Sequence, residues 1–209
     1  MKQRGVVLFF ALIAMLAIML AAVALVRSVD TSTIIAGNLA FKQAATVSGD
    51  AGTEAAIAAL TNIEVANKGL NVLIDPAHPF NITDLTARPG YYSNADPALN
   101  LFADTTWDSD INDSNNTTHN SFVVGVDSSG NKVRYVIQRM CRNPNVAIRD
   151  ADCLFSGAIV DTNGQNIRLP QEICKGDGCP AAGQSPQIRI TSRTTGPKNT
   201  VSYVQAFVY

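Results

Sequence analysis

The sequence predicts an α+β fold in which a long N-terminal helix, with a membrane half and an amphipathic half, packs on a C-terminal antiparallel β-sheet of about four strands. Val6 to Val26 form an unbroken run of 21 apolar residues. The alanine-rich segment 27–65 carries apolar residues at near-helical spacing. Segments 122–138 and 187–209 each predict two β-strands joined by a turn. A helix followed by hairpins favours a layered α+β domain.

The apolar run is long enough to cross a membrane. At about 1.5 Å of rise per residue, its 21 residues reach about 32 Å, which matches a hydrocarbon core about 30 Å thick. Lys2 and Arg4 lie before the run, and only Arg27 follows it closely. Because positive charge stays on the cytoplasmic side, we expect residues 1–5 inside the cell and residues 27–209 outside it.

Three interpretations fit the start of the chain. A cleaved secretory signal would use the small-residue site Ala22-Val23-Ala24, but its apolar core is about 7 to 15 residues long, shorter than this run. A plain signal anchor requires nothing further. A leader of the type IV pilin kind is a basic peptide that ends in glycine, is cut on the cytoplasmic side and leaves the apolar helix attached. Arg4-Gly5 followed by Val6 to Phe10 fits this third pattern.

The composition limits the kinds of partner. Lys and Arg number 16 against 17 Asp and Glu, so no charged face is predicted for nucleic acid. About 180 residues follow the apolar run, enough for one extended helix and one compact head. We therefore divide the chain into a leader, a transmembrane or filament-core helix, an amphipathic helix and a globular head, which occupy residues 1–5, 6–26, 27–65 and 66–209.

The segment after the apolar run predicts a helix that continues out of the membrane. Its apolar residues near helical spacing are Ile35, Leu39, Phe41, Ala45, Ile57 and Leu60. Glycine costs about 1 kcal/mol relative to alanine in a helix, so we expect the helix to loosen at Gly37 and to break near Gly49 and Gly52. The alternative is a membrane anchor with a helical stalk.

Residues 66–120 predict a long surface loop, rich in Asn, Asp, Pro, Ser and Thr. Within it, Asp108, Asp110 and Asn112 are spaced like the first ligands of a calcium-binding loop. The glycine and the glutamate that such a loop needs further on are missing. The calcium site is therefore half matched, and an ordinary solvated loop is the alternative.

The sheet is predicted from two hairpins. The first lies within 122–138, around the turn Ser128-Ser129-Gly130-Asn131. The second lies within 187–209, around the turn Gly196-Pro197-Lys198-Asn199. Four strands would form an antiparallel sheet with one face free to cover the helix, which buries both apolar surfaces.

All four cysteines lie between the two hairpins. An even number in an extracytoplasmic domain predicts two disulfides. Three pairings are possible, and we favour Cys141 with Cys153 and Cys174 with Cys179, because each closes a local loop that contains turn-forming residues. Four thiolates could also hold zinc, but the spacing includes no Cys-x-x-Cys.

Several short motifs lie near the two ends of the chain. Gln3-Arg4-Gly5 precedes the apolar helix, and Arg27-Ser28 and Ala36-Gly37-Asn38-Leu39 follow it. Toward the end come Arg134 to Cys141 and then Ile188 to Gln205. In this order and spacing they resemble the PilX-type minor pilins of the type IV pilus, and the resemblance leaves residues 66–120 uncovered. It implies a type IV pilin-like fold.

The resemblance also implies how the chain is processed. A prepilin peptidase would cut between Gly5 and Val6, and the new terminus would be a substrate for methylation. Major pilins carry a glutamate at the fifth mature position, where it can neutralise a neighbouring subunit's terminal amine; the matching residue here is Phe10. Because an unpaired buried ammonium is costly, a subunit without this carboxylate suits the first place, at the tip. The alternative is that minor subunits tolerate the change.

The function that the resemblance implies is the priming of pilus assembly. The chain would join other minor pilins and a tip adhesin in the inner membrane, with its head in the periplasm, and the major pilin would polymerise from this complex. The head would end at the pilus tip or cell surface, which connects the chain with twitching motility and cell adhesion.

Enzymatic chemistry is not predicted. His78 and His119 lie in predicted loops without a metal or triad context, so we expect neither an enzyme nor a cofactor. Two alternatives to the minor pilin stay open. One is a minor pseudopilin of type II secretion, and the other is a membrane-anchored extracytoplasmic binding module whose loop 75–120 contacts a surface or ligand.

Overall fold

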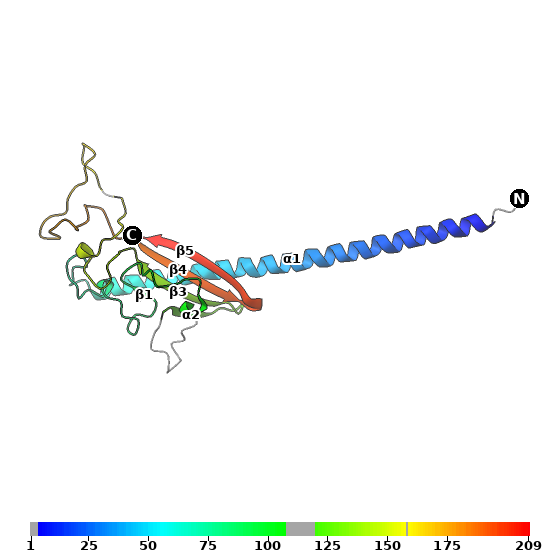
Figure 1. The fold of residues 1–209 in the computed structure, drawn as a ribbon, viewed down its shortest axis with the longest axis horizontal. Helices are drawn as coiled ribbons and strands as arrows, with labels where there is room; N and C mark the ends of the chain where they lie inside the picture. The colour runs from blue at the N-terminus through cyan, green and yellow to red at the C-terminus, as the bar shows by residue number, and fades with distance from the viewer. Residues whose placement is uncertain (1–3, 108–119, 158) are drawn as a thin grey trace. The chain divides into compact units, whose positions relative to one another are not determined.

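The computed structural model describes residues 4–107, 120–157 and 159–209. The chain forms two structural units, residues 1–43 and residues 44–209. The first contains the N-terminal part of helix α1. The second, which we call the head unit, contains the rest of α1, a five-stranded sheet and the connecting segments (Figure 1). The fold is α+β, with an apolar N-terminal helix that packs on a sheet, as the sequence predicts.

Helix α1 (Arg4–Ala66) is continuous, so the expected break near Gly49 and Gly52 is wrong. Gly37 also lies within the helix. Within the head unit, α1 has one buried stripe with helical spacing. Its members are Ala45, Gly49, Gly52, Ala56 and Leu60. This stripe faces the sheet, and the opposite side of the helix is exposed.

The two glycines of this stripe lie directly against side chains of the sheet. A Cβ atom built on Gly49 would lie 2.7 Å from Cγ2 of Val204, and one on Gly52 would lie 2.1 Å from Oγ of Ser192. A side chain at either position would require the contacting side chains of the sheet to move. Close packing against the sheet therefore outweighs the low helix propensity of glycine, which is why propensity alone predicts a break.

The sheet is mixed. Its strands are β1 (Tyr91–Tyr92), β2 (Phe122–Val126), β3 (Lys132–Arg139), β4 (Ile188–Gly196) and β5 (Thr200–Val208). They are ordered β1-β3-β4-β5, and β2 also pairs with β3. Both predicted hairpins are confirmed, since β2 pairs antiparallel with β3 and β4 pairs antiparallel with β5. The purely antiparallel sheet of about four strands is wrong, because β1 adds a fifth strand parallel to β3.

Strand β3 is covered on both faces. On one face, Tyr135 and Ile137 pack with Ala56 and Leu60 of α1. On the other face, Val136 packs with Tyr92 and with Trp107 of the short helix α2 (Asp104–Trp107). Trp107 is fully buried, and its Nε1 donates to the carbonyl of Leu101 over 2.8 Å. The predicted surface loop of residues 66–120 is therefore wrong at Tyr92 and at α2, because these residues cover the second face of the sheet.

Candidate functional site

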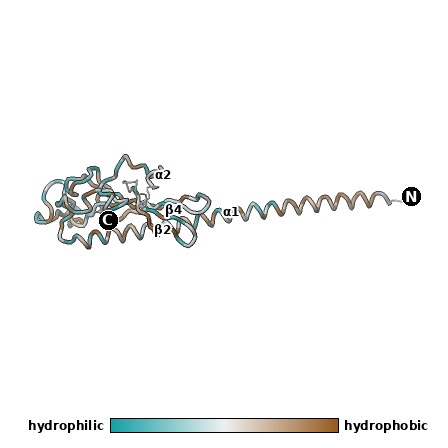
Figure 2. The backbone as a smooth tube through the Cα atoms, turned by 90° about the horizontal axis from the view of Figure 1, so that it is seen from below, coloured by the Kyte–Doolittle hydropathy of each residue, from teal (hydrophilic) through white to brown (hydrophobic). Residues whose placement is uncertain are grey.

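The stretch of α1 from Val6 to Val26 is apolar on every side. All side chains from Val6 to Val26 are exposed, and Figure 2 shows hydrophobic colour along this stretch. A helix of this kind has no polar face for water, so it requires lipid or other apolar helices around it. Within the described part of the chain, α1 is the one helix that is long and apolar enough to cross a membrane.

The predicted processing site lies at the start of this helix. Because α1 begins at Arg4, Gly5 and Val6 fall in its first turn. Phe10 follows one turn later; its side chain is exposed, and its ring lies 6.4 Å from that of Phe9. The first carboxylate of the whole chain is that of Asp30, beyond the apolar run. The run therefore carries no group that could pair with a neighbouring ammonium.

In the head unit, two disulfides organise the segment between β3 and β4. Cys141, two residues after the end of β3, is bonded to Cys153, and Cys174 is bonded to Cys179. The first bond closes a loop that contains the 3-10 turn η2 (Ile148–Asp150). The second loop packs on that turn, because a Cβ atom on Gly178 would overlap the carbonyl of Arg149. Both bonds thus hold one compact structure beside the sheet.

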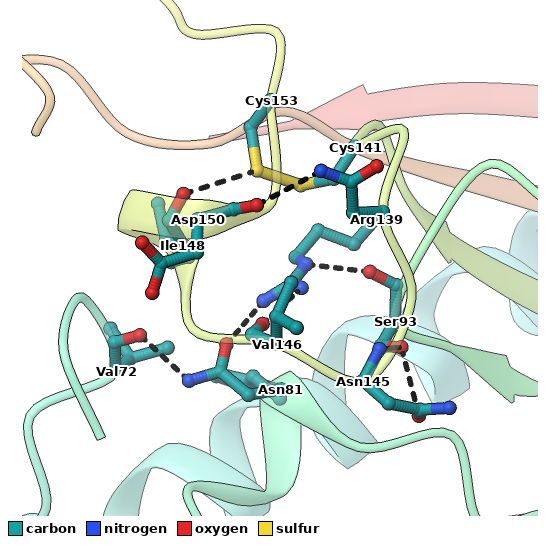
Figure 3. The surroundings of a disulfide bond; sticks show 12 residues. Val72, Asn81, Ser93, Arg139, Cys141, Asn145, Val146, Ile148, Asp150 and Cys153 are labelled. Carbon is teal, nitrogen blue, oxygen red and sulfur yellow. Dashed lines mark hydrogen bonds between the residues drawn. A yellow bond between two sulfur atoms is a disulfide. The ribbon is translucent and has the colours of Figure 1, made fainter. Parts of the chain in front are cut away.

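Arg139, at the end of β3, connects this structure to the rest of the head unit (Figure 3). Its Nε donates to the carbonyl of Ser93 over 2.8 Å, Nη2 donates to the carbonyl of Val146 over 3.0 Å, and Nη1 donates to Oδ1 of Asn81. Asn81 in turn donates to the carbonyl of Val72 over 2.8 Å. One side chain therefore joins three loops to the central strand.

The environment of Arg139 is unusual for a charged group. The residue is 1% exposed, and burial lowers the pKa of its guanidinium. An arginine stays protonated in proteins, so a full charge is held here by neutral oxygens. If one of these loops moved away, the buried guanidinium would lose a hydrogen-bond acceptor, which is costly for a buried charge. Arg139 therefore holds the loops around it in position.

A groove of about 810 Å³ lies between α1, the sheet and the disulfide-linked segment of the head unit. Most of its lining is apolar, and the residues used below are Ile57, Leu60, Ile188, Val208 and Tyr209. Arg139 and Glu64 contribute polar atoms to its wall. An open, mainly apolar groove with few polar groups is typical of a binding site.

His78 is buried near this groove. Its Nδ1 accepts a hydrogen bond from the backbone N–H of Phe80 over 3.2 Å, and its ring lies 5.2 Å from the ring of Phe80. Desolvation lowers the pKa of His78 below its ordinary value of 6.5. The side chain therefore acts as a neutral cap for the 3-10 turn η1 (Pro79–Asn81) rather than as a metal ligand.

The calcium candidates Asp108, Asp110 and Asn112 lie outside the described residues, as does His119. Among the residues that the structure describes, no three His, Cys, Asp or Glu side chains gather as a metal site. The candidate site is therefore a set of surfaces, namely the apolar stretch of α1 from Val6 to Val26 and the groove of the head unit.

The chain matches no protein-family model, and comparison with curated proteins and with solved structures finds no match either.

Sequence reasoning missed two parts of this arrangement. Arg139 lies one residue beyond the predicted hairpin of residues 122–138, and the sequence marks it only as one residue of the motif Arg134 to Cys141. The groove was missed because its walls come from stretches of the chain that are far apart in sequence, from Ile57 to Tyr209. Neither feature follows from a local pattern.

Proposed function

We propose that the chain is a PilX-type minor pilin that helps to prime assembly of the type IV pilus near the filament tip. One observation carries the proposal: after the basic residues Lys2 and Arg4, a single helix is apolar on every side for 21 residues and then presents a stripe of small residues to a sheet. The apolar part needs a partner that the chain does not supply. In the membrane that partner is lipid, and in a filament it is the equivalent helices of other subunits.

Phe10 supports a place at the tip. A subunit that docks below another must meet the free amine of the subunit above it inside an apolar filament core. Without a carboxylate at position 10, the ammonium of that neighbour stays unpaired, which costs several kcal/mol in an apolar environment. The chain is thus poorly suited to the shaft and well suited to the first position, from which other minor pilins, a tip adhesin and the major pilin assemble.

Deletion and complementation in the native host test the proposal. Deletion is expected to remove surface pili. Complementation with the wild-type chain is expected to restore the pili, with the protein located at their tips. Phe10→Glu is expected to spread the protein along the shaft, as seen by immunogold labelling, because the glutamate can pair with a neighbouring amine. Phe9→Glu adds the same charge one residue earlier and is the matched control, which is expected not to enter the shaft. Normal piliation after deletion would contradict the proposal.

The groove of the head unit favours a second candidate, a membrane-anchored extracytoplasmic binding module. This candidate predicts an intact leader and piliation that survives deletion. A type II secretion pseudopilin would share the processed helix, and deletion would then stop protein secretion while pili remain. Two measurements therefore distinguish the three functions, namely the N-terminal residue of the protein and the phenotype of the deletion.

A further inference from the structure

Strand β5 forms an open edge of the sheet in the head unit (Figure 1). It pairs with β4 over nine consecutive positions, from Ile188 with Val208 to Gly196 with Thr200, without a shift in register. Among the described residues, no backbone hydrogen bond reaches the other side of β5. Half of its backbone N–H and C=O groups thus point away from β4 at regular spacing.

The opposite edge of the sheet is protected, and β5 is not. Proteins protect edges with short strands, bulges, prolines or charges. On the opposite edge, β1 has two residues, and β2 has five with an irregularity between Val123 and Gly125. Thr200 to Val208 contain no charge, proline or glycine. The contrast indicates that β5 is kept open for pairing.

The side chains of β5 favour an apolar neighbour. Val201, Tyr203 and Phe207 lie on the face of the sheet away from α1 and are 38–54% exposed. At the C-terminal end of the strand, Val208 and Tyr209 belong to the lining of the apolar groove. A strand added beside β5 would cover these side chains, and a large apolar residue near its end would have a site in the groove.

We propose that β5 binds an extended segment of a different protein, which adds to the sheet as a further strand. The backbone of β5 supplies the hydrogen bonds, and the groove selects the end of the segment. Because β5 carries no charge, the segment is uncharged and rich in β-branched or aromatic residues, with a large apolar side chain for the groove. The proposal goes beyond the pilin function and does not depend on cleavage of the leader.

A second copy of the chain is a poorer occupant. Two copies of β5 related by a two-fold axis would pair antiparallel and form one continuous sheet. When the two strands align over their full length, Thr200 of the partner lies beside Val208. The end of β5 at the groove would then meet a small polar residue, and no large apolar side chain would be available to fill the groove. Antiparallel pairing of two copies is therefore unfavourable.

Hydrogen exchange of the backbone amides of β5 tests the proposal. The full chain is measured in detergent after purification, and again in the assembly isolated from membranes through an epitope tag inserted in the exposed turn after Asn163. The expected result is exchange at least about 100-fold slower in β5 within the assembly, because free amides become hydrogen-bonded. Exchange in β2 should not change.

Two proline variants show whether strand pairing causes the protection. Consecutive residues of a strand direct their N–H groups to opposite edges, so one of Gln205→Pro and Ala206→Pro removes only a free donor. That variant is expected to keep the unfolding temperature of the head within a few degrees and to lose the protection. Val201→Lys, which places a charge at the exposed edge, is the second test and is expected to lose it as well.

Three results would overturn the proposal. Equal exchange of β5 in the purified chain and in the assembly would show that nothing pairs with the edge. Protection that persists in both the free-donor proline variant and Val201→Lys would show that β5 is covered without strand pairing. Protection that already rises with the concentration of the purified chain would show that the occupant is a second copy. The N-terminal residue is determined separately, so these results do not depend on the pilin assignment.

Discussion

Residues 6–26 and residues 44–66 belong to one helix, α1, but they meet different surroundings. Every side chain of the first segment is exposed, and most are large and apolar. The second segment has one buried stripe made largely of alanine and glycine, and its other faces are exposed. Large apolar residues provide contact area for many neighbours, whereas small ones let one sheet approach closely. The second segment therefore has its partner within the chain, and the first needs a partner from outside it.

The largest expected effect is the loss of membrane association when the first segment is made polar. The double variant Leu16→Asp/Leu20→Asp places two charges near the centre of the apolar run, at about 3 kcal/mol each for insertion. We expect most of the protein to leave the membrane fraction after cell lysis, as measured by immunoblotting. Leu16→Ala/Leu20→Ala is the control and should stay in the membrane. Normal membrane retention of the double aspartate variant would mean that this segment does not contact lipid.

The next effect compares a leucine from each segment. Leu60 is buried against the sheet, so Leu60→Ala is expected to lower the free energy of unfolding of the head by about 2–5 kcal/mol. Leu20 is exposed on the apolar run, so Leu20→Ala should leave that free energy unchanged. Trp107 is the only tryptophan and is fully buried, so its fluorescence reports urea unfolding in detergent. Equal effects of the two variants would contradict the comparison.

Glycines sharpen the comparison further. Gly52→Ala forces a Cβ atom into contact with Ser192 and Val133, and we expect it to destabilise the head by about 1–3 kcal/mol. Gly37→Ala meets nothing within 4 Å and should stabilise its part of the helix by about 1 kcal/mol. The same urea titration checks the first variant, and circular dichroism during heating checks the second. Stabilisation by Gly52→Ala would show that the sheet does not approach the helix there.

The sequence predicts the regular parts of the fold and fails where contacts come from distant segments. Segments 122–138 and 187–209 carry strand and turn signals that specify two hairpins, and both are present. Gly49 and Gly52 were misjudged because helix propensity is a local quantity and the sheet that selects glycine is far away in sequence. Strand β1 has two residues, too few for any alternation to show.

The candidate site divides in the same way. The apolar run is visible in the sequence because composition alone determines its need for lipid or helices. Asn81 and Ser93 lie in the predicted loop 66–120 and Arg139 lies one residue beyond the predicted hairpin 122–138, so only the folded chain brings them together. A buried charge held by neutral oxygens has no signature in one sequence.

The smallest expected effect concerns the contact between α1 and the turn after β2. Asp127 accepts hydrogen bonds from Ser48 Oγ over 2.6 Å and from Asn131 Nδ2 over 2.8 Å, and these bonds lower its pKa to about 2 from an ordinary 3.8. The stabilisation is therefore complete above about pH 4 and is lost as the pH falls through 2. Asp127→Asn should flatten the dependence of unfolding free energy on pH between 4 and 2, as urea titrations at several pH values would show. An unchanged slope would mean that this carboxylate does not stabilise the contact. Asp50→Asn, on the exposed side of α1, is the control and should leave the slope unchanged.

The most direct test of the account is the N-terminal residue of the protein recovered from membranes, determined by mass spectrometry of the terminal peptide with and without the prepilin peptidase. We predict a start at Val6 that requires the peptidase, with the apolar segment 6–26 retained for its partners in membrane and filament. A start at Met1 in both strains, or one near Leu25, would contradict it, because the first segment would then be an ordinary anchor or a signal that is removed.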